Sequence, residues 1–124
     1  MTTTELNQVA EQRAREYYRK VDLADLDAVV ELFSSAVTYQ RPGYPTIHGH
    51  GELLQFYRDT RIIDDGEHTV DTVVVDYPRV AVNGRFEGRL RSGELVSLRF
   101  ADFFEVGSDG RFTRRDTFFF APLV

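Results

Sequence analysis

Four long segments in the second half of the chain carry the alternating pattern of β-strands, and only short turns join them. These segments cover residues 69–76, 80–90, 95–106 and 111–120. The joining stretches are rich in Pro, Gly, Ser and Asp, which are the residues that tight turns require. Strands joined in this way lie side by side and antiparallel. The second half therefore predicts a curved antiparallel sheet, with Gly84 and Gly88 as its bulge or bend points.

The first half of the chain has helical spacing instead. Over residues 5–21, the apolar positions that recur every three or four residues are Leu6, Ala10, Ala14, Tyr17 and Val21. Asp25 can cap a second helix that reaches Phe33, and residues 50–60 predict a third helix. A short strand at 37–40 and a Pro-Gly loop at 41–45 lie between them. The order α-α-β-α-β-β-β-β predicts an α+β fold, with three N-terminal helices packed on the concave face of the sheet.

The length and amino-acid composition limit the class of protein to which the chain can belong. A chain of 124 residues with 42% hydrophobic and 28% charged residues is expected to form one folded domain over residues 1–124. The formal charge of −5 argues against a nucleic-acid partner, and no apolar run is long enough for a membrane partner. The chain has no cysteine, which excludes disulfides and thiolate metal sites. We expect a cytoplasmic protein whose ten Phe and six Tyr line a core or a pocket for a small hydrophobic molecule.

The segment 98–104, LRFADFF, places an acid among phenylalanines. Strand alternation puts Asp102 on the same face as Leu98, Phe100, Phe104 and Val106. Burial without a partner would raise the pKa of this carboxyl by as much as ~3–5 units. A neutral carboxylic acid could donate a hydrogen bond to a developing oxyanion or transfer a proton. The alternative is a structural ion pair with an arginine that the sequence does not identify.

A second acid, Asp116, also lies among aromatic residues. By alternation it shares a face with Phe112, Phe118 and Phe120, which predicts an interior position. A slip of one residue at the turn 107–110 would move it to the opposite face. If both Asp116 and Asp102 pointed inward from adjacent strands, their repulsion would separate the two pKa values and provide an acid and a base.

Other candidates would line the pocket. The predicted aromatic lining residues are Tyr39, Phe56, Tyr57, Phe100, Phe104 and Phe118. Arg41 could bind a substrate carboxylate or cover the pocket, or it could be a solvated loop charge. His68 or His50 could carry a proton at the pocket mouth, whereas His48 and His50 could simply begin a helix. No spacing of these histidines fits a metal site, and we expect no metal and no cofactor.

These elements resemble the nuclear-transport-factor-2-like superfamily, in its branch of SnoaL-like polyketide cyclases and ketosteroid isomerases. The stretches that carry the resemblance are Tyr17 with LADLDAVVELF, then HGHGELLQFY, then FADFFEVGSDGRF. The resemblance implies a cone-shaped fold. In ketosteroid isomerase, a tyrosine of the first helix and a protonated aspartate of the sheet form the oxyanion hole, and Tyr17 and Asp102 match them. The isomerase's base precedes a proline, but the residue before Pro42 here is Arg41, which cannot act as a base.

SnoaL-like cyclases lack that base and use an aspartate of the sheet, which Asp102 resembles. The resemblance thus implies a cofactor-independent cyclase, isomerase or dehydratase of a small hydrophobic metabolite, such as a polyketide or another natural product. Its catalytic residues would be Asp102, Tyr17 and Asp116.

Two alternatives remain open. One is a limonene-type epoxide hydrolase using Asp116, Arg85 and Glu87, although alternation places Arg85 and Glu87 on the polar face. The other is a non-catalytic module, which either binds a hydrophobic ligand or is purely structural. We also expect a homodimer through the far face of the sheet, where Val73, Val75, Phe103 and Phe119 would be exposed.

Overall fold

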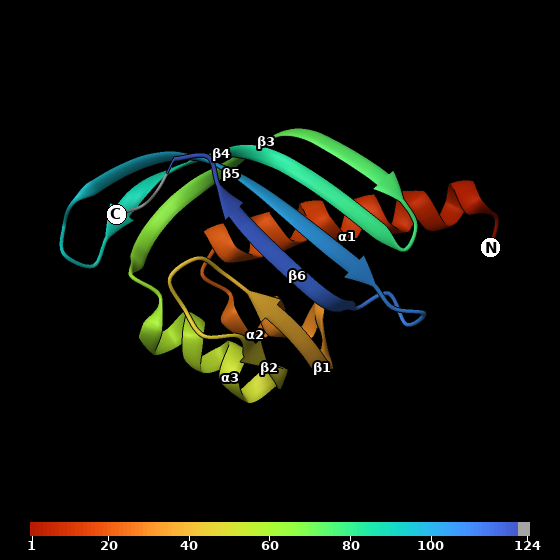
Figure 1. Ribbon diagram of the computed structural model, residues 1–124, viewed down its shortest axis with the longest axis horizontal. Coiled ribbons are helices and arrows are strands. Elements are labelled where there is room, and N and C mark those ends of the chain that lie inside the picture. Colours follow the sequence, from red (N-terminus) through yellow and green to blue (C-terminus); the bar gives the residue numbers. More distant parts are fainter. Residues whose placement is uncertain (122–124) are drawn as a thin grey trace.

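The computed structural model describes residues 1–121 and confirms the predicted α+β fold (Figure 1). The elements in chain order are α1 (Thr3–Asp22), α2 (Leu26–Glu31), β1 (Phe33–Gln40), β2 (Ile47–His48), α3 (Gly49–Gln55), the π-helical turn η1 (Phe56–Thr60), β3 (Ile63–Asp76), β4 (Arg79–Leu90), β5 (Leu95–Val106) and β6 (Phe112–Phe119). Helix α1 runs along the concave side of the sheet, and α2 and α3 lie at the end where β1 and β2 are found (Figure 1).

Within residues 1–121 the sheet has six strands in the order β2-β1-β6-β5-β4-β3. Strands β3 to β6 form the predicted antiparallel meander. Strand β1 lies parallel to β6, and the short strand β2 pairs antiparallel with β1, so the sheet is mixed rather than purely antiparallel. The parallel pair arises because the chain passes through α3 and the whole meander between β1 and β6, which provides the long crossover that parallel strands need.

Two boundaries differ from the sequence expectation. Phe33 begins β1 instead of ending the second helix, because Phe33 pairs with Phe112 and the Phe112 amide donates to the Leu32 carbonyl at 2.9 Å. Strand β3 begins at Ile63, well before residue 69, because its polar first half pairs with the far end of β4. In both cases, pairing with a distant strand overrides the local pattern.

Helix α1 forms where its sequence pattern predicts. Thr2 caps it: the Thr2 hydroxyl accepts from the Glu5 amide at 3.1 Å, and the Glu5 carboxylate accepts from the Thr2 amide at 3.2 Å. This reciprocal capping box satisfies amides that the first helical turn leaves without partners. The residues that the helix buries are Ala10, Ala14, Tyr17, Tyr18 and Val21. Two adjacent tyrosines of α1 therefore reach the core.

The strong curvature of the sheet depends on glycines beside Phe86. A Cβ on Gly66 would lie 2.3 Å from the Phe86 ring, and a Cβ on Gly88 would lie 2.6 Å from the same ring. A Cβ on Gly84 would come within 2.2 Å of the Thr69 carbonyl oxygen. Bare backbone at these positions lets β3 and β4 bend closely around the ring, which is the role expected of Gly84 and Gly88.

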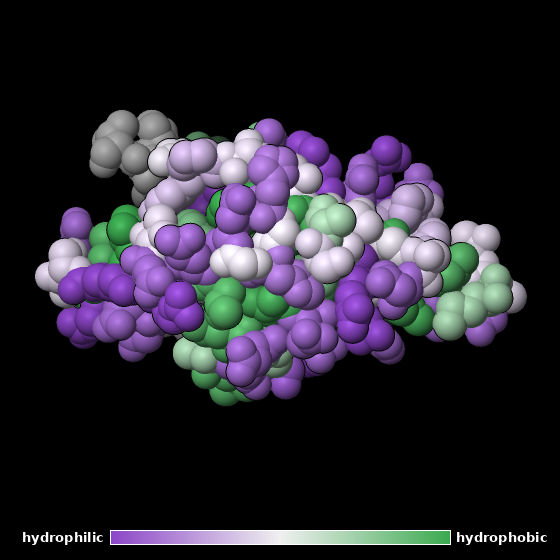
Figure 2. Space-filling view, turned by 90° about the horizontal axis from the view of Figure 1, so that it is seen from below, coloured by the Kyte–Doolittle hydropathy of each residue, from purple (hydrophilic) through white to green (hydrophobic). Residues whose placement is uncertain are grey.

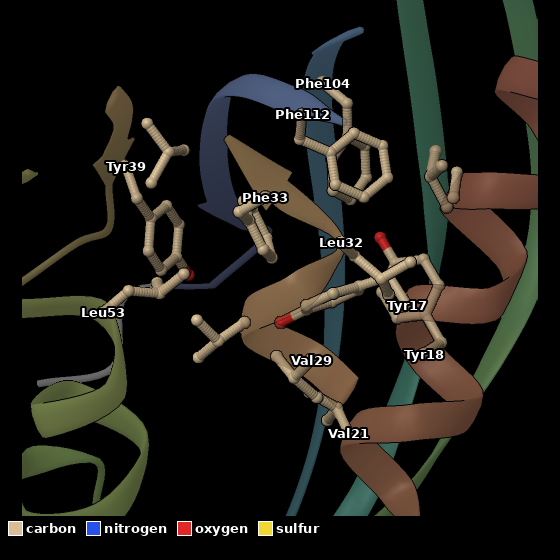
Figure 3. Close-up of a cluster of buried hydrophobic side chains, with 14 of the residues drawn as sticks. Tyr17, Tyr18, Val21, Val29, Leu32, Phe33, Tyr39, Leu53, Phe104 and Phe112 are labelled. Carbon is tan, nitrogen blue, oxygen red and sulfur yellow. The ribbon is translucent and has the colours of Figure 1, made fainter. Parts of the chain in front are cut away.

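The core lies between α1, α2, the start of β1 and the inner face of β5 and β6. Figure 3 shows Phe33 at its centre, with Tyr17 and Phe112 among its neighbours. The Phe33 ring packs edge-on against Tyr17 at 5.7 Å and against Phe112 at 5.2 Å between ring centroids. Seen from the side of α3, the surface is mostly polar, with hydrophobic residues gathered near the middle (Figure 2). Within the described part of the chain, no helix combines the length and apolarity that a membrane crossing needs.

The outer face of the sheet carries a different apolar set from the one predicted. Val74, Phe103 and Phe118 are exposed by 61%, 51% and 55%. Val73, Val75 and Phe119 instead pack against the core, so these three predicted positions were wrong and only Phe103 was right. The cause is register: shifts within β3 and at the start of β6 exchange the two faces of both strands.

Candidate active site

Asp102 lies where the alternation of β5 predicts, fully buried on the inner face of the sheet. Its carboxylate accepts two hydrogen bonds from Arg115, from Nε to Oδ1 at 3.1 Å and from Nη2 to Oδ2 at 3.0 Å. The Thr117 hydroxyl donates to Oδ1, and the Tyr18 hydroxyl donates to Oδ2. Thr117 stands directly opposite Asp102 on β6, while Arg115 reaches it diagonally from a position opposite Phe104.

The environment of Asp102 favours the ionised form. Burial acts to raise its pKa, but the charge of Arg115 and the hydrogen bonds from Arg115, Thr117 and Tyr18 outweigh burial and hold that pKa below its ordinary value. Of the two possibilities that the sequence leaves open for Asp102, the structure therefore shows the ion pair, with Arg115 as the arginine that the sequence does not identify. An ionised carboxylate only accepts hydrogen bonds, so Asp102 has no proton to donate to an oxyanion.

A chain of hydroxyl groups extends from Asp102 toward the loop after β1. Because the single Thr117 proton is donated to Asp102, the Tyr39 hydroxyl must donate in its 3.0 Å hydrogen bond to Thr117. Arg41 Nη1 in turn donates to the Tyr39 hydroxyl at 3.1 Å. Tyr39 is therefore buried behind the site as a link between Arg41 and Asp102.

Arg115 also organises a second pair of hydroxyls. Its Nη1 donates to the hydroxyls of Tyr17 and Tyr57, and these two hydroxyls bond to each other. One of the two can donate to the other, which leaves the second O–H without an acceptor in this network. Tyr17 lines the cavity and Tyr57 does not, so Tyr17 can direct its proton into the cavity. Burial raises the pKa of Tyr17 well above its ordinary value, so its hydroxyl remains protonated.

His68 of β3 provides a group that can accept a proton. Its backbone amide and its Nδ1 contact the two oxygens of Asp22, the last residue of α1, at 2.8 and 2.6 Å. Because a carboxylate only accepts, Nδ1 carries the proton and Nε2 has the free lone pair. Burial lowers the pKa of His68 in spite of Asp22, so the imidazole is neutral near pH 7. The ring lies between Tyr18 and Phe86, with centroid separations of 5.2 and 4.7 Å, and it lines the same cavity as Tyr17.

These groups surround a small inner cavity of about 20 Å³, the volume that a single water-sized molecule needs. The residues that line it are Tyr17, Arg41, Arg61, Ile63, His68, Phe86, Leu98, Phe100, Asp102, Arg115, Thr117 and Phe119. It adjoins an outer hollow of about 390 Å³, which shares Arg41, Ile63, Leu98 and Phe119 with it. A ligand of ordinary metabolite size would therefore place its apolar body in the outer hollow and direct its polar groups toward the inner cavity.

Several sequence candidates lie behind the cavity wall. Phe104 packs against Tyr17 and Phe112, with ring centroids 5.8 and 4.5 Å away. Phe56 supports Arg41, whose guanidinium lies 5.4 Å from its ring centroid. His50 contacts the Phe33 carbonyl at 2.6 Å, which is a structural role, and His48 is exposed. Among the predicted lining residues, Phe100, Arg41 and His68 do reach the cavity.

Asp116 and Phe118 were assigned to the wrong face. Between the pairs Val106–Phe112 and Glu105–Arg114 the register of β6 shifts by one residue at Thr113. This bulge turns Arg115, Thr117 and Phe119 inward and Asp116 and Phe118 outward. Asp116 accepts from Arg114 Nε at 3.0 Å, and Phe118 packs against Phe103 on the outer face. Asp102 and Asp116 therefore do not form an interior pair.

The alternative epoxide hydrolase site is not assembled. Arg85 and Glu87 point outward from β4, as their alternation indicates, and Arg85 pairs with Asp71 at 3.2 Å. Asp116 lies on the outer face of a different strand, and none of these three residues lines the inner cavity. Within residues 1–121, His, Asp and Glu side chains form no cluster suited to hold a metal ion.

Sequence reasoning missed five polar residues of the site, which are Tyr18, Asp22, Arg61, Arg115 and Thr117. Tyr18 could have been found from its position beside Tyr17, because a buried helix stripe is wide enough to include both. Arg115 and Thr117 could not, because they face inward only on account of the bulge at Thr113. Asp22 meets His68 through the packing of α1 on β3, a contact across 46 residues that no local pattern shows.

Comparison with known proteins finds one matching family and several solved structures with a similar fold. The family model described as a SnoaL-like domain matches residues 14–115. A protein of unknown function with the NTF2-like fold from Burkholderia pseudomallei is 23% identical, with a TM-score of 0.81 and 90% of each chain covered.

Two further solved structures extend the comparison. One is SalBIII, an epoxide hydrolase/cyclase-like enzyme with a role in pyran ring formation in the polyether salinomycin. It is 20% identical to this chain, with a TM-score of 0.80 and coverage of 90% of this chain and 91% of that one. A protein with a ketosteroid isomerase-like fold from Catenulispora acidiphila is 13% identical, with a TM-score of 0.75 and coverage of 86% and 83%. At these identities the structural likeness concerns the fold alone.

Proposed function

The chain belongs to the family of SnoaL-like domains, and on that premise we propose that it is an enzyme that transfers a proton at a carbon next to a carbonyl group. His68 is the base in this proposal. The observation that carries it is the joint placement of the His68 ring and the Tyr17 hydroxyl on the wall of one cavity. The substrate is a small, largely hydrophobic metabolite, in keeping with the apolar residues of the outer hollow.

The first step follows from the hydrogen-bonding groups of the site. His68 Nε2 takes a proton from the carbon next to the carbonyl, the C–H electron pair forms a C=C bond, and negative charge develops on the carbonyl oxygen. Tyr17 donates to that oxygen, and Arg115 holds the Tyr17 hydroxyl in place. Asp22 keeps the imidazole in the required tautomer and compensates the charge that His68 gains. Asp102 is a positioning residue, because it fixes Arg115 and does not transfer a proton.

The second step decides the class of reaction. If the proton on His68 returns to another carbon, the result is an isomerisation. If the enolate carbon attacks a second carbonyl within the substrate, the proton goes to the new alkoxide and the result is a cyclisation. If a hydroxyl leaves from the neighbouring carbon, the proton leaves with it as water and the result is a dehydration. All three reactions use the same base and the same oxyanion donor.

Deuterium uptake tests this proposal without knowledge of the natural substrate. Aryl alkyl ketones and cyclic enones, each with and without a carboxylate, are incubated with the protein in D₂O, and exchange next to the carbonyl is followed by NMR. We expect accelerated exchange whose kcat/KM rises with pH and reaches a plateau above the pKa of His68, because only the neutral imidazole accepts a proton. Burial lowers that pKa from the ordinary value of histidine, so the plateau should begin at a lower pH than for a free imidazole. The proposal would be contradicted if no compound exchanged faster with the protein than without it, or if kcat/KM did not rise with pH in this way.

We also propose that two copies of the chain associate through the outer face of the sheet. Val74, Phe103 and Phe118 form an exposed apolar patch there, and Arg79, Arg114, Asp76 and Glu105 border the same hollow. Both signs of charge are present, so a copy related by a two-fold axis can pair them.

Light scattering at micromolar concentration measures this association. We expect a dimer for the wild type and a monomer for Phe118→Glu, because the substitution places a charge in the middle of the buried patch. Leu23→Glu is the matched control, since Leu23 is exposed by 74% at the end of α1. A monomeric wild type, or a Phe118→Glu variant that remains dimeric, would refute the proposed interface.

A further inference from the structure

The inner cavity holds more positive charge than its reaction chemistry requires. Among the described residues that line it, Arg41, Arg61 and Arg115 face a single carboxylate, Asp102. Arg115 makes four hydrogen bonds, two to Asp102 and one each to Tyr17 and Tyr57. His68 is neutral, and Asp22 lies behind it without lining the cavity. Arg41 and Arg61 therefore form a surplus of two positive charges at the site.

Neither surplus arginine has an acidic partner within residues 1–121. Arg41 donates to the Tyr39 hydroxyl, and its guanidinium lies between the rings of Phe56 and Phe119, 5.4 and 5.3 Å from their centroids. These aromatic contacts fix the plane of the guanidinium and leave its other N–H groups free to bind a ligand.

Arg61 is the more unusual of the two. Its Nε is buried and has no hydrogen-bond partner among the described residues. Its guanidinium lies 5.6 Å from the Tyr57 ring centroid and lines the cavity beside Arg41. A buried charged donor without a partner costs free energy, and proteins retain such groups where a ligand supplies the missing partner. Among the described residues that line the outer hollow, the one acid is Glu94, which is exposed.

We propose that the substrate is an organic acid whose carboxylate binds between Arg41 and Arg61, while its reacting carbonyl reaches Tyr17 and His68. This assignment rests on the proposed function and specifies its substrate class. The planar fork of arginine matches a carboxylate with two parallel hydrogen bonds. The charges also agree: a substrate monoanion and the negative charge that develops on the carbonyl oxygen together compensate the surplus of two. The apolar part of the acid lies in the outer hollow.

Binding of matched pairs of compounds tests this assignment directly. We use 3-phenylpropanoate with 3-phenylpropanamide and a longer pair, 5-phenylpentanoate with its amide, and measure affinity by isothermal titration calorimetry. For the wild type we expect each acid to bind ~10–100-fold more tightly than its amide, since hydrogen bonds between charged groups are the strong ones. Arg61→Gln should bring each pair to within a few-fold while the affinity for the amides is unchanged.

Arg58→Gln is the matched control, because Arg58 lies in the turn η1, which Arg61 directly follows, but is exposed and pairs with Asp59 at 3.2 Å. It should keep the wild-type preference. Arg61→Met provides a second measurement. It should raise the midpoint of thermal unfolding of the free protein, because it removes an unpartnered buried donor. It should also abolish the increase in this midpoint that 3-phenylpropanoate causes in the wild type.

The outcomes separate this inference from the proposed function. His68→Gln should lose proton exchange and keep the preference for acids, because His68 does not contact the carboxylate. If exchange fails in the wild type but acids still bind selectively through Arg61, the site binds acids and the assigned reaction is wrong. Equal affinity for acid and amide, absence of acid binding at millimolar concentration, or an undiminished preference in Arg61→Gln would each overturn the assignment.

Discussion

Arg115→Met alone is expected to lower the free energy of unfolding by about 3–5 kcal/mol, the loss typical of a buried ion pair that keeps only one partner. Among the described residues, the substitution leaves the fully buried Asp102 carboxylate with Tyr18 and Thr117 as its remaining donors. It also removes the donor shared by Tyr17 and Tyr57. Urea unfolding followed by circular dichroism measures the change.

The double variant Asp102→Leu with Arg115→Met distinguishes a network effect from lost packing. Replacing both partners removes the unpaired charge, so we expect the double variant to recover much of the stability that either single substitution loses. Arg85→Met is the control, because Arg85 forms an exposed pair with Asp71 and should leave stability unchanged within error. Additive losses in the double-mutant cycle would show that Asp102 and Arg115 do not depend on each other.

His68→Gln is expected to lower the rate of carbon-bound deuterium exchange by ~10²–10⁴-fold, the usual contribution of a positioned general base. Glutamine has a similar size and retains hydrogen-bonding groups, but its amide cannot accept a proton near neutral pH. Asp22→Asn should reduce the rate less, because the histidine remains but loses the carboxylate that orients it. NMR exchange rates at saturating ketone provide the measurement.

His48→Gln is the matched control for this experiment, since His48 is an exposed histidine outside the cavity. Its exchange rate should equal that of the wild type. A His68→Gln variant that folds, binds ligand and exchanges at the wild-type rate would remove His68 from the base role. The exchange rate of Asp102→Asn would then be compared with that of His68→Gln, because asparagine preserves the shape of the side chain but weakens its hydrogen bonds with Arg115.

The sequence was a good guide wherever a single strand or helix decides the outcome. Alternation along β5 correctly placed Asp102 among Phe100, Phe104 and Val106 on the buried face. The helical spacing of α1 correctly placed Tyr17 in the core. These predictions hold because the periods of the helix and the strand are fixed by backbone geometry and do not depend on distant partners.

The sequence was a poor guide wherever two segments must be placed relative to each other. Asp116 was assigned to the wrong face, because the bulge at Thr113 depends on how β6 pairs with β5. The sequence could not decide between a raised pKa and an ion pair for Asp102 for the same reason: the deciding charge belongs to Arg115 on the neighbouring strand. The contact between Asp22 and His68 likewise depends on how α1 packs against β3.

The bulge at Thr113 has a consequence for how such a scaffold can change its chemistry. Deleting one residue there would rotate the following strand by half a period, which would bring an acid inward and send its basic neighbour to the solvent. The loss of a single codon at this bulge would thus invert the electrostatic character of the interior without substituting any residue that follows it in the strand.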